Sequence, residues 1–269
     1  MLTRRLLFAA LALAPRAVLA DGGTLAPEME RIAARRQGLI IATAVDLPPY
    51  VVTTSDGTLA GEDITLGRGL AEALGVAHNF VQAGTPDEII DLVTRGGADV
   101  AIARLSITLD RARSVRFSRP YLVLRHALLL NRQHVAQATP GMDLPAALNA
   151  PEATVAVVAD SGYAEAARRL LPRATLHNFP RWQPDVVDAV RQGEAIAGYG
   201  DERQVEGALT ATPDAPLQLR RFVLDGTRDA IAIALPWSSL QLLAWVDLFL
   251  ESRAASDDSG DASVKRNDK

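Results

Sequence analysis

Residues 85–103 read TPDEIIDLVTRGGADVAIA, and this stretch indicates the class of fold. Thr85, Pro86 and Glu88 are the residue types of a capping box with proline at the first helical position, so we expect a helix that ends at the glycine pair. The apolar run 98–103 that follows predicts a strand buried in a sheet. A helix that leads directly into a buried strand is typical of α/β proteins.

The same alternation precedes this stretch. The run 38–45 is continuous, apolar and rich in β-branched residues, which predicts another buried strand. A helix is expected from about Asp63 to Leu74, with Gly75 as its left-handed C-cap. Strands and helices that alternate in this way predict right-handed crossovers onto one mostly parallel sheet.

A second copy of the pattern lies further along the chain. Residues 184–195 read PDVVDAVRQGEA and are similar in sequence to residues 86–98. The pattern predicts strands at 153–159, 174–179 and 195–199 and helices at 162–171 and 184–192. The expected fold is therefore α/β, with two similar lobes of mostly parallel strands.

The chain is expected to cross between these lobes twice, within 121–131 and near 225–227. Lobe 1 is then discontinuous and consists of 38–124 plus 229–251, while lobe 2 consists of 130–224. Ligands of open α/β sheets bind beyond the carboxyl ends of the strands, so we expect the ligand in the cleft between the lobes.

The last part of the chain contains a helix followed by a polar segment. The helix is expected at 239–251 and should pack on lobe 1. The side chains expected to make that contact are Leu240, Leu243, Val246, Leu248 and Leu250. The segment 252–269 is charged and lacks apolar periodicity, so we expect it to be disordered.

The composition excludes several kinds of site. The 269 residues include no cysteine, which rules out disulfides, thiolate zinc sites, iron–sulfur clusters and cysteine nucleophiles. The four histidines show no spacing typical of metal ligands. We therefore expect neither a metal site nor a cofactor.

The first residues predict an exported protein. Arg4 and Arg5 precede the apolar run 6–14, and small residues lead to Ala20, which together predict a signal peptide over 1–20. The Sec and twin-arginine routes both stay open. Without this segment the chain has 25 basic and 32 acidic residues, and the net charge of −7 disfavours nucleic acid as a partner. The apolar run is too short to span a bilayer, so we expect a soluble periplasmic monomer.

A family resemblance adds to this interpretation. The stretch 105–111 reads LSITLDR, is followed by Phe117-Ser118 and Pro120-Tyr121, and resembles the signature of the extracytoplasmic solute-binding proteins of family 3. The resemblance implies the type II periplasmic binding protein fold. It also implies a non-catalytic protein that captures a small amino acid or related carboxylate and delivers it to the membrane permease of an ABC transporter.

Two alternative functions stay open on the same fold. One is a secreted cyclohexadienyl-type dehydratase, but Gln204 stands where the resemblance would place the catalytic glutamate, so no catalytic residue is assigned. The other is a module that presents its ligand to a receptor kinase.

The chemistry of an α-amino acid suggests how the residues after each strand would bind it. Arg111 offers a planar cationic fork for a carboxylate, and Ser106 offers a hydroxyl and an amide. Ser161 and Gly162, at the start of a helix, would add free amides near the same anion. Asp201, from the other lobe, would accept the ammonium group.

These assignments have alternatives, and Arg111 could simply be a surface helix residue beside Arg113 and Arg116. Asp201 could serve only as a helix N-cap, and Ser161-Gly162 could be an ordinary turn before a helix. Arg104 could reach a second ligand carboxylate, pair with Asp201 and block the ammonium, or point to solvent. The remaining candidates for the cleft are Leu47, Tyr50 and Leu105.

Overall fold

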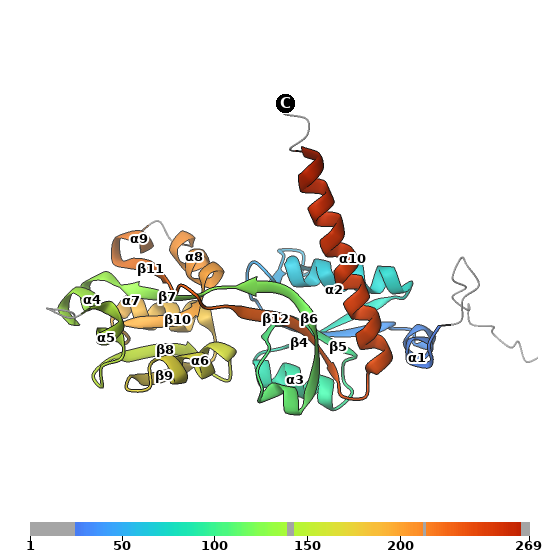
Figure 1. Ribbon diagram of the computed structural model, residues 1–269, viewed down its shortest axis with the longest axis horizontal. Coiled ribbons are helices and arrows are strands. Elements are labelled where there is room, and N and C mark those ends of the chain that lie inside the picture. The colour runs from blue at the N-terminus through green and yellow to red at the C-terminus, as the bar shows by residue number, and fades with distance from the viewer. Residues whose placement is uncertain (1–24, 139–142, 212–213, 265–269) are drawn as a thin grey trace, which may run out of the picture.

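The computed structural model describes residues 25–138, 143–211 and 214–264. They form two lobes, each built around a five-stranded sheet, which lie side by side (Figure 1). Helices cover both mixed sheets, which confirms the expected α/β class with two similar lobes. The signal peptide expected over 1–20 lies outside the described residues.

Lobe 1 is made of the following elements: α1 (Pro27–Ala34), β1 (Leu39–Ala44), β2 (Val52–Thr53), β3 (Leu59–Ala60), α2 (Glu62–Leu74), β4 (His78–Ala83), α3 (Pro86–Thr94), β5 (Val100–Ser106), η1 (Arg111–Arg113), β6 (Val115–Leu124), β12 (Asp229–Pro236) and α10 (Leu240–Val264). Its sheet has the order β4-β1-β5-β12-β6. β1 is parallel to β4 and β5, whereas β12 is antiparallel to β5 and β6. A strand from late in the chain therefore completes the first sheet.

Lobe 2 is made of the following elements: β7 (His126–Asn131), α4 (Arg132–Ala138), α5 (Leu144–Leu148), β8 (Thr154–Val158), α6 (Gly162–Leu170), β9 (Thr175–Phe179), η2 (Trp182–Val186), α7 (Val187–Gln192), β10 (Ala197–Asp201), α8 (Glu202–Thr210), α9 (Ala215–Gln218) and β11 (Leu219–Val223). Its sheet has the order β11-β7-β10-β8-β9. β8 is parallel to β9 and β10, and β7 is antiparallel to β10 and β11. The two sheets thus share one plan.

Local signals explain where several helices begin and end. The Thr85 hydroxyl accepts from the Glu88 amide, and the Glu88 carboxylate accepts from the Thr85 amide, so the expected capping box starts α3. Gly75 ends α2 with φ of 72°, as expected of a left-handed cap. The helix expected from Pro184 differs, because its first turn is the irregular segment η2 and regular helix begins at Val187.

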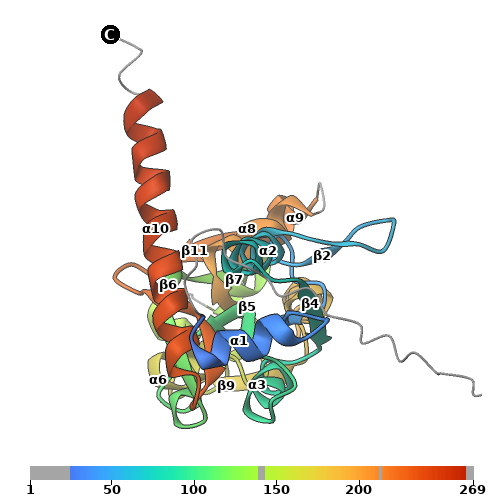
Figure 2. The same ribbon diagram turned by 90° about the vertical axis from the view of Figure 1, so that its right-hand side faces the viewer.

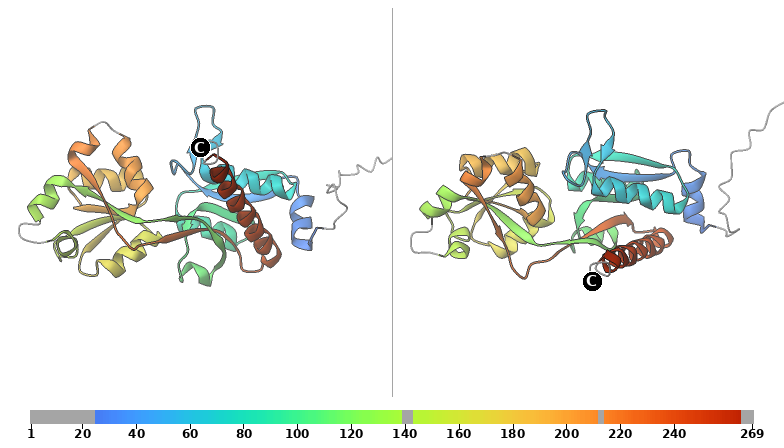
Figure 3. Two further views of the ribbon diagram at one scale, coloured as in Figure 1. Left: turned by 45° about the horizontal axis from the view of Figure 1, so that its top comes forward. Right: turned by 90° about the horizontal axis from the view of Figure 1, so that it is seen from above.

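Two extended segments join the lobes. β6 runs into β7, and β11 leads through the turn after Val223 into β12. β6 and β12 are paired antiparallel along their length, so both segments lie side by side between the lobes (Figure 3). Such a paired connection is the geometry of a hinge.

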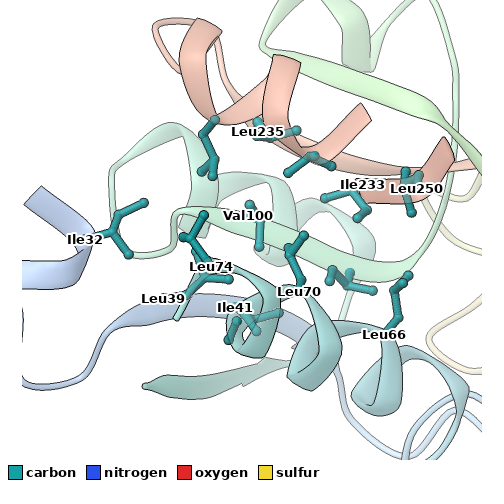
Figure 4. Close-up of a cluster of buried hydrophobic side chains, with 14 residues drawn as sticks. Ile32, Leu39, Ile41, Leu66, Leu70, Leu74, Val100, Ile233, Leu235 and Leu250 are labelled. Atoms are coloured by element: carbon teal, nitrogen blue, oxygen red, sulfur yellow. The ribbon is translucent and has the colours of Figure 1, made fainter. Parts of the chain in front are cut away.

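The core of lobe 1 lies between its sheet and the helices α1, α2 and α10 (Figure 4). Leu39 and Ile41 of β1 and Ile233 of β12 are fully buried against Leu70 of α2. These strands are apolar along their length because their other face is also buried, in a second cluster that contains residues of α3.

The final helix packs on lobe 1 through one face only. Leu242, Val246 and Leu250 are buried and recur every four residues, which places them on one side of α10. The expected contacts of Leu240 and Leu248 are wrong, since these side chains are 56% and 64% exposed. Leu242 packs on lobe 1 instead, because it lies four residues before Val246 and therefore on the same side of the helix.

The end of α10 also differs from expectation. The sequence predicts disorder from Ser252, but the helix continues to Val264 and its end projects away from lobe 1 (Figure 2). Once the first half of a helix is held by packing, adding further turns costs little even without apolar contacts. In the described part of the chain, no helix combines the length and apolarity needed to cross a membrane.

Gly61 provides a test of how the start of α2 is built. It has φ of +117°, and a Cβ at this position would lie 2.2 Å from the carbonyl oxygen of Tyr50. We expect Gly61→Ala to lower the free energy of unfolding by about 3 kcal/mol, because it adds a backbone clash to an unfavourable φ. Urea unfolding measures this loss.

Gly57→Ala is the matched control for this variant. Gly57 also has positive φ, of +82°, but an added Cβ would meet nothing within 4 Å. Its loss should be about 1 kcal/mol. Equal losses in the two variants would contradict a role for close backbone approach at Gly61.

Candidate functional site

A cavity of about 700 Å³ lies between the two lobes. Lobe 1 lines it with the residues after β1, the end of β5 and the first turn of α3. Lobe 2 lines it with the first turn of α6, with one side of α8 along its length and with η2. These are mostly the segments that follow strands. The cavity is therefore where the strand order predicts a binding site.

Arg104 and Asp201 form an ion pair across the two lobes. Arg104 Nη1 contacts Asp201 Oδ2, and the two side chains are 6% and 0% exposed. Burial disfavours the charged form of Arg104, but the adjacent Asp201 carboxylate outweighs it and raises the Arg104 pKa. The structure thus contains one of the alternatives left open by the sequence, in which Arg104 pairs with Asp201.

Asp201 is also the N-cap of α8. Its Oδ1 accepts hydrogen bonds from the backbone amides of Arg203 and Gln204, each at 2.9 Å. Both carboxylate oxygens are therefore engaged within the protein, and Asp201 is not among the described residues that line the cavity. Its role as acceptor of a ligand ammonium stays a prediction, and this geometry disfavours it.

The surroundings of Arg104 hold it firmly in place. Its backbone has φ of +49°, in the left-handed region that few side chains adopt. The guanidinium carbon lies 5.2 Å from the ring centroid of Tyr50 and 5.6 Å from that of Tyr163. Cation–π attraction from both rings adds to the ion pair.

A buried carboxyl supports the backbone of Arg104. The Arg104 amide donates to the Tyr121 hydroxyl at 3.2 Å, and this hydroxyl donates to Asp63 Oδ1 at 2.9 Å. Asp63 is fully buried, and its Oδ2 has no hydrogen-bond partner among the described residues. Burial raises the pKa of Asp63 to about 7, although the Tyr121 hydrogen bond opposes this shift.

Arg111 reaches from lobe 1 to lobe 2. Its Nη1 donates to the carbonyl of Ser106 at 3.1 Å, and its Nη2 donates to the carbonyl of Asp160 at 2.7 Å. Among the described residues it forms no ion pair with a carboxylate, and burial lowers its pKa. A cation that lines the cavity without a carboxylate partner is suited to bind an anion.

The lobes touch next to Arg111. A Cβ on Gly162 would lie 2.5 Å from both Cβ and Oγ of Ser106. Ser106 Oγ donates to Asp229 Oδ2 at 2.9 Å. Ser161 Oγ caps α6 by accepting from the Ala164 amide at 3.1 Å, as the sequence predicts for a helix start. The first amides of α6 have no acceptor within the helix and carry its positive dipole end.

The other candidate residues are divided between cavity wall and interior. Leu47 and Leu105 line the cavity, whereas Tyr50 is fully buried beneath Arg104. Their roles in ligand binding stay predictions. Trp182 also lines the cavity, and its Nε1 donates to the carbonyl of Gln204 at 3.1 Å, which links η2 to α8.

One contact between the lobes was missed by sequence reasoning. Arg203 Nη1 donates to both oxygens of Glu62, at 3.0 and 2.8 Å, and both residues line the cavity. The two residues are 141 positions apart, and no local pattern connects them.

In the described part of the chain, no group of three or more His, Asp or Glu side chains is placed to hold a metal ion.

Comparison with known proteins extends this description. Residues 39–260 match the model of the bacterial extracellular solute-binding proteins, family 3. The crystal structure of an ancestral amino acid-binding protein, a precursor of cyclohexadienyl dehydratase, superimposes with a TM-score of 0.72 at 26% identity and covers 90% of this chain and 99% of that one. These matches confirm the family resemblance and the type II periplasmic binding protein fold.

Two curated relatives are enzymes. Cyclohexadienyl dehydratase of Pseudomonas aeruginosa is 34% identical over 112 residues, which is 41% of this chain and 41% of that protein. Membrane-bound lytic murein transglycosylase F of Maricaulis maris is 25% identical over 187 residues, 67% of this chain and 39% of that protein. The aligned part is thus about two fifths of the length of each relative.

Gly162→Ala tests the contact between the lobes. Alanine is a good helix former at the start of α6, but its Cβ would collide with Ser106, so we expect each lobe to fold and the lobes to stay apart. Small-angle X-ray scattering should show a larger radius of gyration than in the parent.

Gly207→Ala in α8 is the control, because an added Cβ there meets nothing within 4 Å. Its radius of gyration should equal that of the parent. An unchanged radius in Gly162→Ala would show that the two lobes do not touch at Ser106.

Asp63→Asn tests the buried carboxyl through its pH dependence. The folded-state pKa of about 7 exceeds the ordinary value of 3.8, so the folded protein binds a proton that the unfolded chain has released. This contribution is fully present below about pH 4 and is lost as the pH rises toward about 7. The parent should thus lose on the order of 3 kcal/mol relative to Asp63→Asn over this range. If the free energy of unfolding changed with pH in the same way in both proteins, the pKa of Asp63 would not be raised by folding.

Proposed function

Because the chain belongs to the bacterial extracellular solute-binding proteins of family 3, we propose that it captures a small amino acid or related carboxylate between its lobes and presents it to the membrane permease of an ABC transporter. The observation that carries this proposal is Arg111, a cation that lines the cavity without a carboxylate partner and contacts both lobes. The predicted signal peptide supports a periplasmic location, and we expect a monomer.

Groups from both lobes can meet one carboxylate. Arg111 and Ser106 come from lobe 1, and the first amides of α6 come from lobe 2. A carboxylate bound between them replaces the neutral carbonyl acceptors of Arg111 with an anionic acceptor, which forms stronger hydrogen bonds. Contacts to both lobes exist only in the closed form, so the ligand stabilises closure by the difference in its affinity for the two forms.

A dehydratase is the second candidate, and the relative from Pseudomonas aeruginosa supports it. The cavity wall argues against it. Gln204 lines the cavity at the position where the family resemblance would place the catalytic glutamate, and an amide cannot transfer a proton as a carboxyl does. A module that presents its ligand to a receptor kinase would use the same cavity, so the cavity does not separate this function from transport. Neighbouring genes for a permease and an ATPase would favour transport.

Thermal unfolding with a panel of amino acids and carboxylates tests the proposed capture. A ligand at 100 times its dissociation constant adds roughly 2.7 kcal/mol of stability. We expect Arg111→Ala to abolish this shift while the unliganded melting temperature stays near that of the parent. Turnover of prephenate or arogenate by the purified protein would support the dehydratase instead.

Arg113→Ala is the matched control. Arg113 is two positions away, its side chain is 82% exposed, and it pairs with Asp110. This variant should keep the full ligand-induced shift. Equal shifts in the parent and in Arg111→Ala would remove Arg111 from the site.

A further inference from the structure

The charges around the cavity restrict the ligand it can hold. An α-ammonium group needs a carboxylate or several carbonyls as acceptors. Asp201 is the carboxylate buried where the lobes meet, and its two oxygens already accept from Arg104 and from the amides of Arg203 and Gln204. An ammonium group could reach Asp201 only by displacing the Arg104 guanidinium, which would leave a buried cation without its partner.

The acidic residues that line the cavity do not replace Asp201. Asp46, Glu62 and Glu206 are all exposed to solvent. Glu62 is paired with Arg203, and Glu206 is paired with Arg221. Exposed carboxylates bind a cation weakly, and two of the three are already neutralised.

Two further buried acids lie behind the cavity wall. Asp63 accepts from the Tyr121 hydroxyl, and Asp229 accepts from the Ser106 hydroxyl. Neither is among the described residues that line the cavity. The described lining therefore contains no buried carboxylate that is free to accept an ammonium group.

The two arginines of lobe 1 that line the cavity, Arg104 and Arg111, favour an anionic ligand. The Arg104 charge is neutralised by Asp201, whereas Arg111 donates only to two carbonyls. Arg111, which is half-buried, is thus left for a ligand anion. An incoming ammonium group would meet Arg104 and Arg111 without a free buried anion, and like charges at short range repel.

Most of the remaining wall is apolar. Aliphatic, proline and indole side chains, among them Leu47, Pro86, Ile89, Val158 and Trp182, line it together with several serine, threonine and glutamine side chains. Such a wall is suited to an apolar ligand body, because removing apolar surface from water is favourable.

We propose that the ligand is a monocarboxylate with an apolar body and no α-ammonium group. This inference rests on the proposed function and narrows it: the carboxylate binds Arg111, the body lies against Trp182 and its neighbours, and the Arg104–Asp201 pair excludes amino acids.

Matched ligand pairs that differ only in the ammonium group test the inference by titration calorimetry. The pairs are propanoate with L-alanine, 4-methylpentanoate with L-leucine, and 3-phenylpropanoate with L-phenylalanine. For the pair whose body fits, we expect the acid without the ammonium to bind at least about tenfold more tightly. Tighter binding of the amino acid overturns this inference but leaves the proposed function standing, whereas binding of no member overturns both.

Arg104→Gly provides a second, independent result. Glycine suits the positive φ of this position, and loss of the guanidinium frees Asp201 Oδ2. The variant should gain affinity for the amino acid of the fitting pair and so reverse the preference. The double variant Arg104→Gly/Asp201→Asn should lose that gain. Unchanged preference in a folded Arg104→Gly protein would show that the ion pair does not select the ligand.

Discussion

The buried ion pair between Arg104 and Asp201 is the interaction on which the site depends. It joins the end of β5 in lobe 1 to the start of α8 in lobe 2, and the rings of Tyr50 and Tyr163 lie around the guanidinium. Burying two charges costs desolvation energy that offsets much of their attraction, so such a pair adds little net stability, but removing one partner leaves an uncompensated buried charge. By contrast the Arg203–Glu62 pair, at 42% and 53% exposure, contributes about 0 to 1 kcal/mol.

Much of the fold could be predicted because its signals are local. The capping box at Thr85 and Glu88 and the left-handed Gly75 act within a single turn, and the repeat of the first pattern near Pro184 indicates the second lobe. Predictions failed where the outcome depends on neighbouring elements. The face of α10 that packs is set by the surface of lobe 1, and its length beyond Glu251 is set by propagation from the packed turns.

The location of the site could be predicted from the sequence, but the ion pairs between its side chains could not. The segments after the strands that were expected to form it do line the cavity, because parallel strands bring their carboxyl ends to one edge. Sequence alone left three positions open for the Arg104 side chain, since its partner is 97 residues away in the other lobe. Only the approach of the lobes decides between them. Of the described arginines that line the cavity, Arg111 is the one without a carboxylate partner.

A crystal structure of the protein with its bound ligand is the decisive measurement. We expect it to show a carboxylate on the Arg111 guanidinium, an Arg104 side chain still in contact with Asp201, and no ligand atom within hydrogen-bonding distance of Asp201. A ligand ammonium bound to Asp201, with the Arg104 side chain turned out of the cleft, would contradict this expectation.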